Sequence, residues 1–148
     1  MQLSKRRILY IEDHEDTREL ITLVLQQKDF EVVTGSTVAN GVALAEDGQF
    51  DLYLLDSWLP DGSGLDLCRK IRIFDQTTPI LFYSAAAYEA DRELALQSGA
   101  QAYLVKPTQT TELCSLVTSL IENFQSELNI VTTNSTSCHS HWPQLSEE

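Results

Sequence analysis

The sequence predicts an α/β protein built on an open, doubly wound sheet of five parallel strands flanked by five helices. Five short apolar runs alternate along the 148 residues with five stretches whose apolar residues recur at helical spacing, and short loops join them. The run at residues 52–55 is apolar at every position, which is typical of a strand covered on both faces of a parallel sheet. Strands that alternate with helices in this way favour parallel crossover connections.

The expected strands lead to polar side chains. The five apolar runs span residues 8–11, 30–33, 52–55, 80–83 and 102–105. At the carboxyl ends of four of them stand, in chain order, Asp13, Asp56, Ser84 and Lys106. Open parallel sheets bind their ligands beyond the carboxyl ends of the strands. The sequence therefore predicts one polar site at that edge of the sheet.

The expected helices have apolar stripes and recognisable ends. The stripes lie at residues 20–25, 38–45, 65–74 and 90–96, and the last helix is expected over about residues 110–127. Asp16 or Thr17 is suited to cap the first helix, because a short polar side chain there can accept a hydrogen bond from a free backbone N–H. Gly48 and Gly99 are suited to end the second and fourth helices.

Length and composition favour one globular domain with a short tail. A hydrophobic fraction of 43% over 148 residues is sufficient for a core, and we expect the domain to cover residues 1–127. From residue 128 the composition turns to Thr, Asn, Ser, His and Glu. Residues 128–148 are therefore expected to form a flexible polar tail.

Charge and hydropathy limit the expected partners. The formal net charge of −12 argues against nucleic acid as a partner, because contacts with phosphates need a basic surface. No apolar run approaches the roughly 20 residues that a membrane span needs, and the first residues lack the apolar segment of a signal peptide. We therefore expect no membrane association and a cytoplasmic location.

Three acids converge if the first and third strands are neighbours: Glu12, Asp13 and Asp56. Carboxylates gather only where positive charge sits among them, and oxygen ligands at an open site suit Mg²⁺. Lys106 offers a point charge for a phosphoryl oxygen, and the Ser84 hydroxyl can donate to another. Asp56, a single acid at the end of the most apolar strand, is the best candidate nucleophile. The reaction class that follows is phosphoryl transfer onto Asp56.

These residues resemble the receiver domain of bacterial response regulators, in particular the stand-alone type similar to chemotaxis regulators. The resemblance covers residues 5–127. It rests on the acidic pair Glu12-Asp13, on Asp56 followed by the Leu-Pro-Asp-Gly-Ser-Gly stretch at residues 59–64, on Ser84-Ala85, and on Lys106-Pro107. Each motif alone is weak, but all four occur in order and each lies at a strand end.

The resemblance implies a flavodoxin-like fold with strand order 2-1-3-4-5 and an aspartyl-phosphate at Asp56. The phosphoryl group would come from the phosphohistidine of a sensor histidine kinase or phosphotransfer protein. Asp13, Asp56 and the backbone carbonyl of Trp58 would hold Mg²⁺, with Glu12 acting through water. Lys106 would pair with the phosphoryl group, next to a cis peptide bond before Pro107. The protein would catalyse only its own Mg²⁺-dependent phosphorylation and slow dephosphorylation.

The resemblance also implies a switch. Ser84 and the backbone of Ala85 would bind the phosphoryl group, and Tyr103 would turn inward. Gly62 would serve the turn after the phosphorylation site. The face made by the fourth helix, fifth strand and fifth helix would change, so that phosphorylation shifts the population between two states. A downstream effector protein would bind this face, and a homodimer through it is a further expectation.

Three residues depart from the family pattern. Trp58 is bulky for its position two residues after Asp56, and we expect its ring to shield the phosphoryl group from water. His14 follows the acidic pair where a further acid is common. Thr108 follows the Lys-Pro pair where an aromatic residue is usual.

Two alternatives remain from the sequence. The chain would be a receiver-like interaction module independent of phosphorylation if Asp56 took no phosphate, although all five polar site residues are present. A phosphatase of the haloacid-dehalogenase type also forms an aspartyl-phosphate on an α/β sheet. That type needs a second Asp two residues after the nucleophile, where this chain has Trp58.

Overall fold

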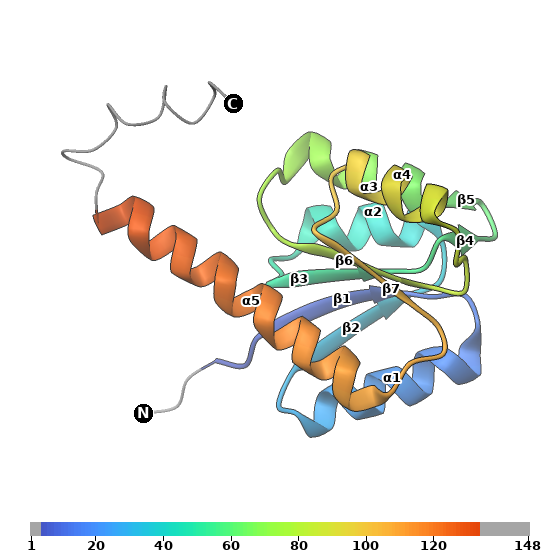
Figure 1. Cartoon of the computed structure of the whole chain (residues 1–148), viewed down its shortest axis with the longest axis horizontal. Coiled ribbons are helices and arrows are strands. Elements are labelled where there is room, and N and C mark those ends of the chain that lie inside the picture. Colours follow the sequence, from blue (N-terminus) through green and yellow to red (C-terminus); the bar gives the residue numbers. More distant parts are fainter. Residues whose placement is uncertain (1–3, 134–148) are drawn as a thin grey trace.

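The computed structural model describes residues 4–133, and of residues 128–133 it describes the backbone alone. Within this range it confirms the expected parallel sheet, with strands in the order β2-β1-β3-β6-β7 (Figure 1). The strands are β1 (Arg7–Ile11), β2 (Glu31–Gly35), β3 (Leu52–Leu55), β6 (Ile80–Ser84) and β7 (Ala102–Val105). Counted along the chain without the small hairpin described below, this is the order 2-1-3-4-5.

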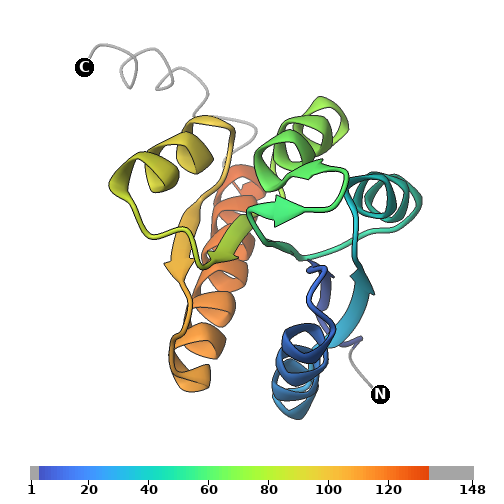
Figure 2. The same cartoon turned by 90° about the vertical axis from the view of Figure 1, so that its right-hand side faces the viewer.

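Helices cover both faces of the sheet. One face carries α1 (Glu15–Gln27) and α5 (Thr110–Thr133), and the other carries α2 (Val38–Asp47), α3 (Gly64–Phe74) and α4 (Glu89–Gln97) (Figure 2). Each layer has its own apolar core, because successive strand residues point to opposite faces. In β1, Ile8 and Tyr10 pack with α1 and α5, whereas Leu9 and Ile11 pack with α2 and α3. No helix within residues 4–133 combines the length and the apolar character of a membrane span.

The register of the strands brings the predicted polar residues together. Ile11 of β1 pairs with Leu55 of β3, so that Glu12 and Asp56 leave the sheet from neighbouring positions. The N–H of Asp56 donates to the carbonyl of Ile11 at 3.1 Å and extends this pairing by one residue. On the far side of β3, Ser84 of β6 pairs with Val105 of β7, directly before Lys106. Parallel pairing thus sends each of these side chains to one edge.

A small hairpin stands where the sequence predicted only a turn. It consists of β4 (Trp58–Leu59) and β5 (Gly62–Ser63), which pair in antiparallel fashion directly after Asp56. Gly62 has a φ angle of 156°, which explains why glycine is suited to this position. The hairpin leads straight into α3, whose first turn is capped by the hydroxyl of Ser63.

Two helix ends differ from the sequence expectations. The cap of α1 is His14 rather than Asp16 or Thr17, because its ring nitrogen Nδ1 accepts from the backbone N–H of Thr17 at 3.3 Å. The last helix continues to Thr133, six residues beyond the end expected at about residue 127. Residues 134–148 of the expected tail lie outside the described residues, and the boundary at 127 stays a prediction.

Gly64 occupies the tightest position around Asp56. A Cβ atom at this position would overlap the carbonyl oxygen of Asp56 and lie 2.9 Å from the ring of Phe82. The N–H of Gly64 also donates to the carbonyl of Ser57 at 2.8 Å. The absence of a side chain here therefore lets the backbone carrying Asp56 lie directly against the start of α3.

Gly64→Ala should destabilise the domain by about 1–3 kcal/mol, because overpacking a close contact forces backbone shifts. Urea unfolding of the wild type and the variant measures this loss. Ser57→Ala is the matched control, because it leaves the backbone contact between residues 57 and 64 intact. A Gly64→Ala protein as stable as the wild type would show that the carbonyl of Asp56 is free to move.

Candidate functional site

A pocket of about 490 Å³ opens at the carboxyl edge of the sheet. Its walls come from the ends of β1, β3 and β7, from the first turn of α1, from the hairpin, and from the loop between β6 and α4. The predicted site residues among its lining are Glu12, Asp13, Asp56, Trp58, Ala85 and Lys106. Residues that lie up to 94 positions apart in the chain are thus brought around one cavity.

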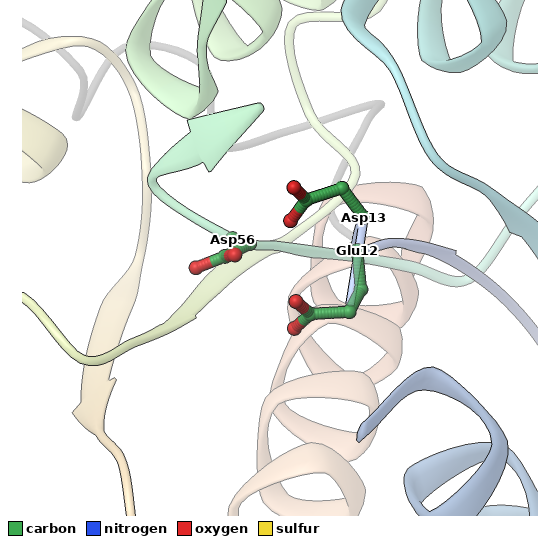
Figure 3. A group of neighbouring side chains, drawn as sticks. All are labelled: Glu12, Asp13 and Asp56. Carbon is green, nitrogen blue, oxygen red and sulfur yellow. The ribbon is translucent and has the colours of Figure 1, made fainter. Parts of the chain in front are cut away.

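Three carboxylates face a common space in this pocket, as Figure 3 shows. Glu12, Asp13 and Asp56 each offer one oxygen, and these oxygens lie within 4.8 Å of one another. Glu12 and Asp56 are 1% and 7% exposed, whereas Asp13 is open to solvent. A cluster of carboxylate oxygens with one solvent-exposed member fits a hard cation such as Mg²⁺, which keeps several of its waters.

Lys106 supplies the positive charge of the pocket. Its Nζ lies 2.6 Å from Oε1 of Glu12 and 3.7 Å from Oδ1 of Asp56. The ammonium group also lies 5.5 Å from the centre of the Tyr83 ring. The peptide bond between Lys106 and Pro107 is cis, as the resemblance implies. Lys106 is thus closer to Glu12 than to Asp56 and bridges the two buried acids.

The charge of Asp56 is only partly compensated. Burial and the neighbouring charge of Glu12 raise the pKa of Asp56 to about 6. Lys106 and the backbone N–H of Ser57, which donates to Oδ1 at 2.8 Å, act in the opposite direction. The environment of Asp56 therefore favours a further positive group near its carboxylate.

Ser84 and Tyr103 lie around the loop that follows β6. Ser84 is fully buried, and its hydroxyl accepts from the N–H of Ala86 at 3.0 Å, so it does not line the pocket. Tyr103 donates to the carbonyl of Ala86 at 2.6 Å, and its hydroxyl lies 3.5 Å from Oγ of Ser57. Its ring stacks on Phe82 with centres 5.8 Å apart. Tyr103 thus joins this loop to the residue that follows Asp56.

The hairpin after Asp56 is anchored by a contact that sequence reasoning missed. The carboxylate of Asp61 accepts from the N–H groups of Val38 at 2.7 Å and Ala39 at 3.0 Å, and so caps the start of α2. These hydrogen bonds lower the pKa of Asp61. The sequence suggested a turn residue, because no local pattern links positions more than 20 residues apart. Trp58, on the same hairpin, is 64% exposed at the rim of the pocket.

A second missed contact lies beneath the acids. The hydroxyl of Tyr10 donates to Oε1 of Glu12 at 3.3 Å, and Arg18 donates to the Glu12 carbonyl at 2.8 Å. The backbone N–H of His14 donates to Oε2 of Glu12 at 3.3 Å. The alternation of β1 predicts a buried Tyr10, but it does not reveal that the ring reaches the acid two residues later.

Comparisons with known proteins agree with this geometry. The family model described as the response regulator receiver domain matches residues 8–118. A curated relative from Picosynechococcus, named a probable transcriptional regulatory protein, is 37% identical over 129 residues, which are 82% of this chain and 51% of the relative. The chain spans about half the length of the curated relatives of this kind that it matches.

Solved structures show the same fold. A CheY-like receiver domain protein from Methanospirillum hungatei has a TM-score of 0.81 and 26% identity, over 84% of this chain and 99% of its own. The receiver domain of the sensor histidine kinase PA1611 from Pseudomonas aeruginosa, with a magnesium ion coordinated in its active-site cleft, has a TM-score of 0.75 and 30% identity, over 80% of this chain and 98% of its own. Together with its sheet order and its acidic pocket, these matches show that the chain belongs to the response regulator receiver domain family.

Proposed function

We propose that this receiver domain accepts a phosphoryl group on Asp56 from the phosphohistidine of a sensor histidine kinase or a phosphotransfer protein. The observation that carries the proposal is the buried Asp56 carboxylate, which shares one pocket with two further acids and lies 3.7 Å from the ammonium group of Lys106. Carboxylates gathered around a single lysine suit a ligand that brings both a cation and an anionic group.

The transfer follows from the groups that face the pocket. A carboxylate oxygen of Asp56 forms a bond to phosphorus, and the bond from phosphorus to the imidazole nitrogen of the donor breaks. The electron pair stays on that nitrogen, which takes a proton from water. Lys106 lies near enough to Asp56 to pair with an oxygen of the transferred group.

The acids fit a magnesium ion, and each has a proposed role. Asp13, Asp56 and the backbone carbonyl of Trp58 would hold it, with Glu12 acting through water. When bound, Mg²⁺ would neutralise part of the charge on the phosphoryl oxygens. Asp13, the exposed member of the three, is suited to contact an ion that retains waters.

The signal would pass through the loop between β6 and α4. Ser84 and the backbone of Ala85 would move toward the phosphoryl group, and the bond from Ser84 to Ala86 would break. Tyr103 depends on the same loop through the carbonyl of Ala86, so its position would change with it. The α4–β7–α5 face would then differ between the two states, and an effector that binds one state better would respond to phosphorylation.

Exposed apolar side chains on this face support its role in binding. Leu94 of α4 is 43% exposed and Val105 of β7 is 38% exposed. A downstream effector protein or a second copy of the chain is the proposed partner. The curated relative named a probable transcriptional regulatory protein does not support the expectation that excludes nucleic acid.

Incubation with acetyl phosphate and Mg²⁺ should add one phosphoryl group, a gain of ~80 Da in intact mass. The gain should require Mg²⁺ and disappear in Asp56→Asn, because the amide removes the nucleophile. Ser57→Ala is the control for a general disturbance of this segment. If neither acetyl phosphate nor a histidine kinase labels the wild type, the phosphorylation-independent interaction module becomes the better description.

Asp56→Asn should stabilise the metal-free protein at pH 8 and leave its stability nearly unchanged at pH 4. The folded protein binds the Asp56 proton more tightly than the unfolded chain, so wild-type stability falls as pH rises from the ordinary aspartate pKa of 3.8 through about 6. The variant lacks this loss and should gain about 1–3 kcal/mol above pH 6. Urea unfolding in EDTA at both pH values measures the difference, and an equal effect at both would contradict the raised pKa.

Trp58→Ala should shorten the lifetime of the phosphorylated protein several-fold, because the exposed ring stands at the rim of the pocket and limits the approach of water. Loss of phosphate over time, followed by intact mass, gives the rate. Trp58→Phe should retain most of the protection, and Ile73→Ala, which removes an exposed apolar side chain outside the pocket, should have none of the effect. An unchanged rate in Trp58→Ala would exclude the shielding role.

A further inference from the structure

The hydroxyl of Tyr10 lies beneath the acidic pocket and reaches one of its carboxylates. Tyr10 is fully buried, and its ring packs in the core shared by β1, α1 and α5. Its hydroxyl donates to Oε1 of Glu12 at 3.3 Å. The same oxygen accepts from Nζ of Lys106 at 2.6 Å. One oxygen of Glu12 is thus shared between a neutral donor from the core and a charged donor from the end of β7.

Glu12 depends on these donors because almost none of its surface meets water. It is 1% exposed, and its other oxygen accepts from the backbone N–H of His14 at 3.3 Å, the same distance as from the Tyr10 hydroxyl. Among the described contacts of its carboxylate, Lys106 provides the positive charge, whereas Arg18 contacts the backbone carbonyl. A buried carboxylate that loses a donor retains the full cost of its desolvation. If Lys106 moves away from Glu12, the carboxylate is therefore stabilised only by its remaining described donors, the Tyr10 hydroxyl and the N–H of His14.

Phosphorylation as proposed above would draw Lys106 away. Nζ lies 3.7 Å from Asp56 and would pair with an oxygen of the phosphoryl group, at the expense of its short bond to Glu12. Tyr10 cannot follow Lys106, because its ring is fixed in the core. Its hydroxyl, which donates to Oε1 of Glu12 at 3.3 Å, therefore stays beside the carboxylate.

We propose that Tyr10 is a positioning residue, whose hydroxyl holds the carboxylate of Glu12 in place when Lys106 transfers from Glu12 to the phosphoryl group. This inference rests on the proposed function and adds a role for a residue outside the pocket lining. The Tyr10 hydroxyl stays hydrogen-bonded to the carboxylate of Glu12 both before and after Lys106 moves. It thereby favours the state in which Lys106 contacts the phosphoryl group.

The test compares affinity for beryllofluoride, a phosphoryl mimic, with affinity for Mg²⁺ alone. The chain has two tryptophans, so a Trp142→Phe background leaves the pocket residue Trp58 as the fluorescent reporter. Tyr10→Phe should weaken beryllofluoride binding at saturating Mg²⁺ about tenfold, as expected for one hydrogen bond to a charged group. Affinity for Mg²⁺ alone should change less than twofold, because Lys106 then remains on Glu12.

Two further variants separate positioning from general destabilisation. Tyr53→Phe is the matched control, because Tyr53 is 1% exposed and donates to the carboxylate of Asp75 at 2.7 Å, outside the pocket. It should leave beryllofluoride affinity within twofold of the wild type. In a Glu12→Gln background, Tyr10→Phe should have less than a twofold effect, because the hydroxyl then lacks the charged group through which it acts.

The outcomes distinguish this inference from the proposed function. A wild type that binds no beryllofluoride in the presence of Mg²⁺ overturns the proposed function and the inference with it. A wild type that binds, together with a Tyr10→Phe variant of equal affinity, overturns the inference alone. Equal losses for beryllofluoride and for Mg²⁺ also overturn it, as does a tenfold loss that persists in the Glu12→Gln background.

Discussion

The parallel pairing of β1 with β3 places the buried acids Glu12 and Asp56 side by side. Neighbouring groups must therefore compensate two negative charges at this edge of the sheet. Glu12 and Asp56 leave the sheet from paired positions and cannot separate without breaking the register. Their repulsion is offset by Lys106 from the end of β7 and by backbone N–H groups. The raised pKa of Asp56 shows that the chain's own groups leave this compensation incomplete.

The sequence was sufficient to predict the main elements and six of the residues that line the pocket. The strand and helix patterns predicted each main element within a few residues, because strands buried on both faces appear as continuous apolar runs and helices buried on one side appear as periodic stripes. The contacts of Asp61 with α2, of Gly64 with Asp56, and of Tyr10 with Glu12 were not predictable. The first two depend on how distant elements pack, and the third on how far a buried ring extends along its strand.

The two layers of the fold contribute differently to the pocket. Tyr10 reaches it from the core beneath α1 and α5, whereas Phe82 and Tyr103 belong to the core beneath α2, α3 and α4. Tyr10 of the first layer donates to Glu12, and Tyr103 of the second layer donates to the carbonyl of Ala86 in the loop after β6. A change at Asp56 as proposed would therefore meet separate contacts on the two sides of the sheet.

The length of α5 has a mechanical consequence. The helix has 24 residues. Its first turns pack on the sheet, and its C-terminal part extends past the other elements, as Figure 1 shows. At the usual rise the helix is about 36 Å long. A stiff rod of this length converts a tilt of about 5° at its packed end into a displacement of about 3 Å at its tip. A small rearrangement next to β7 that tilted this helix would thus be enlarged at Thr133.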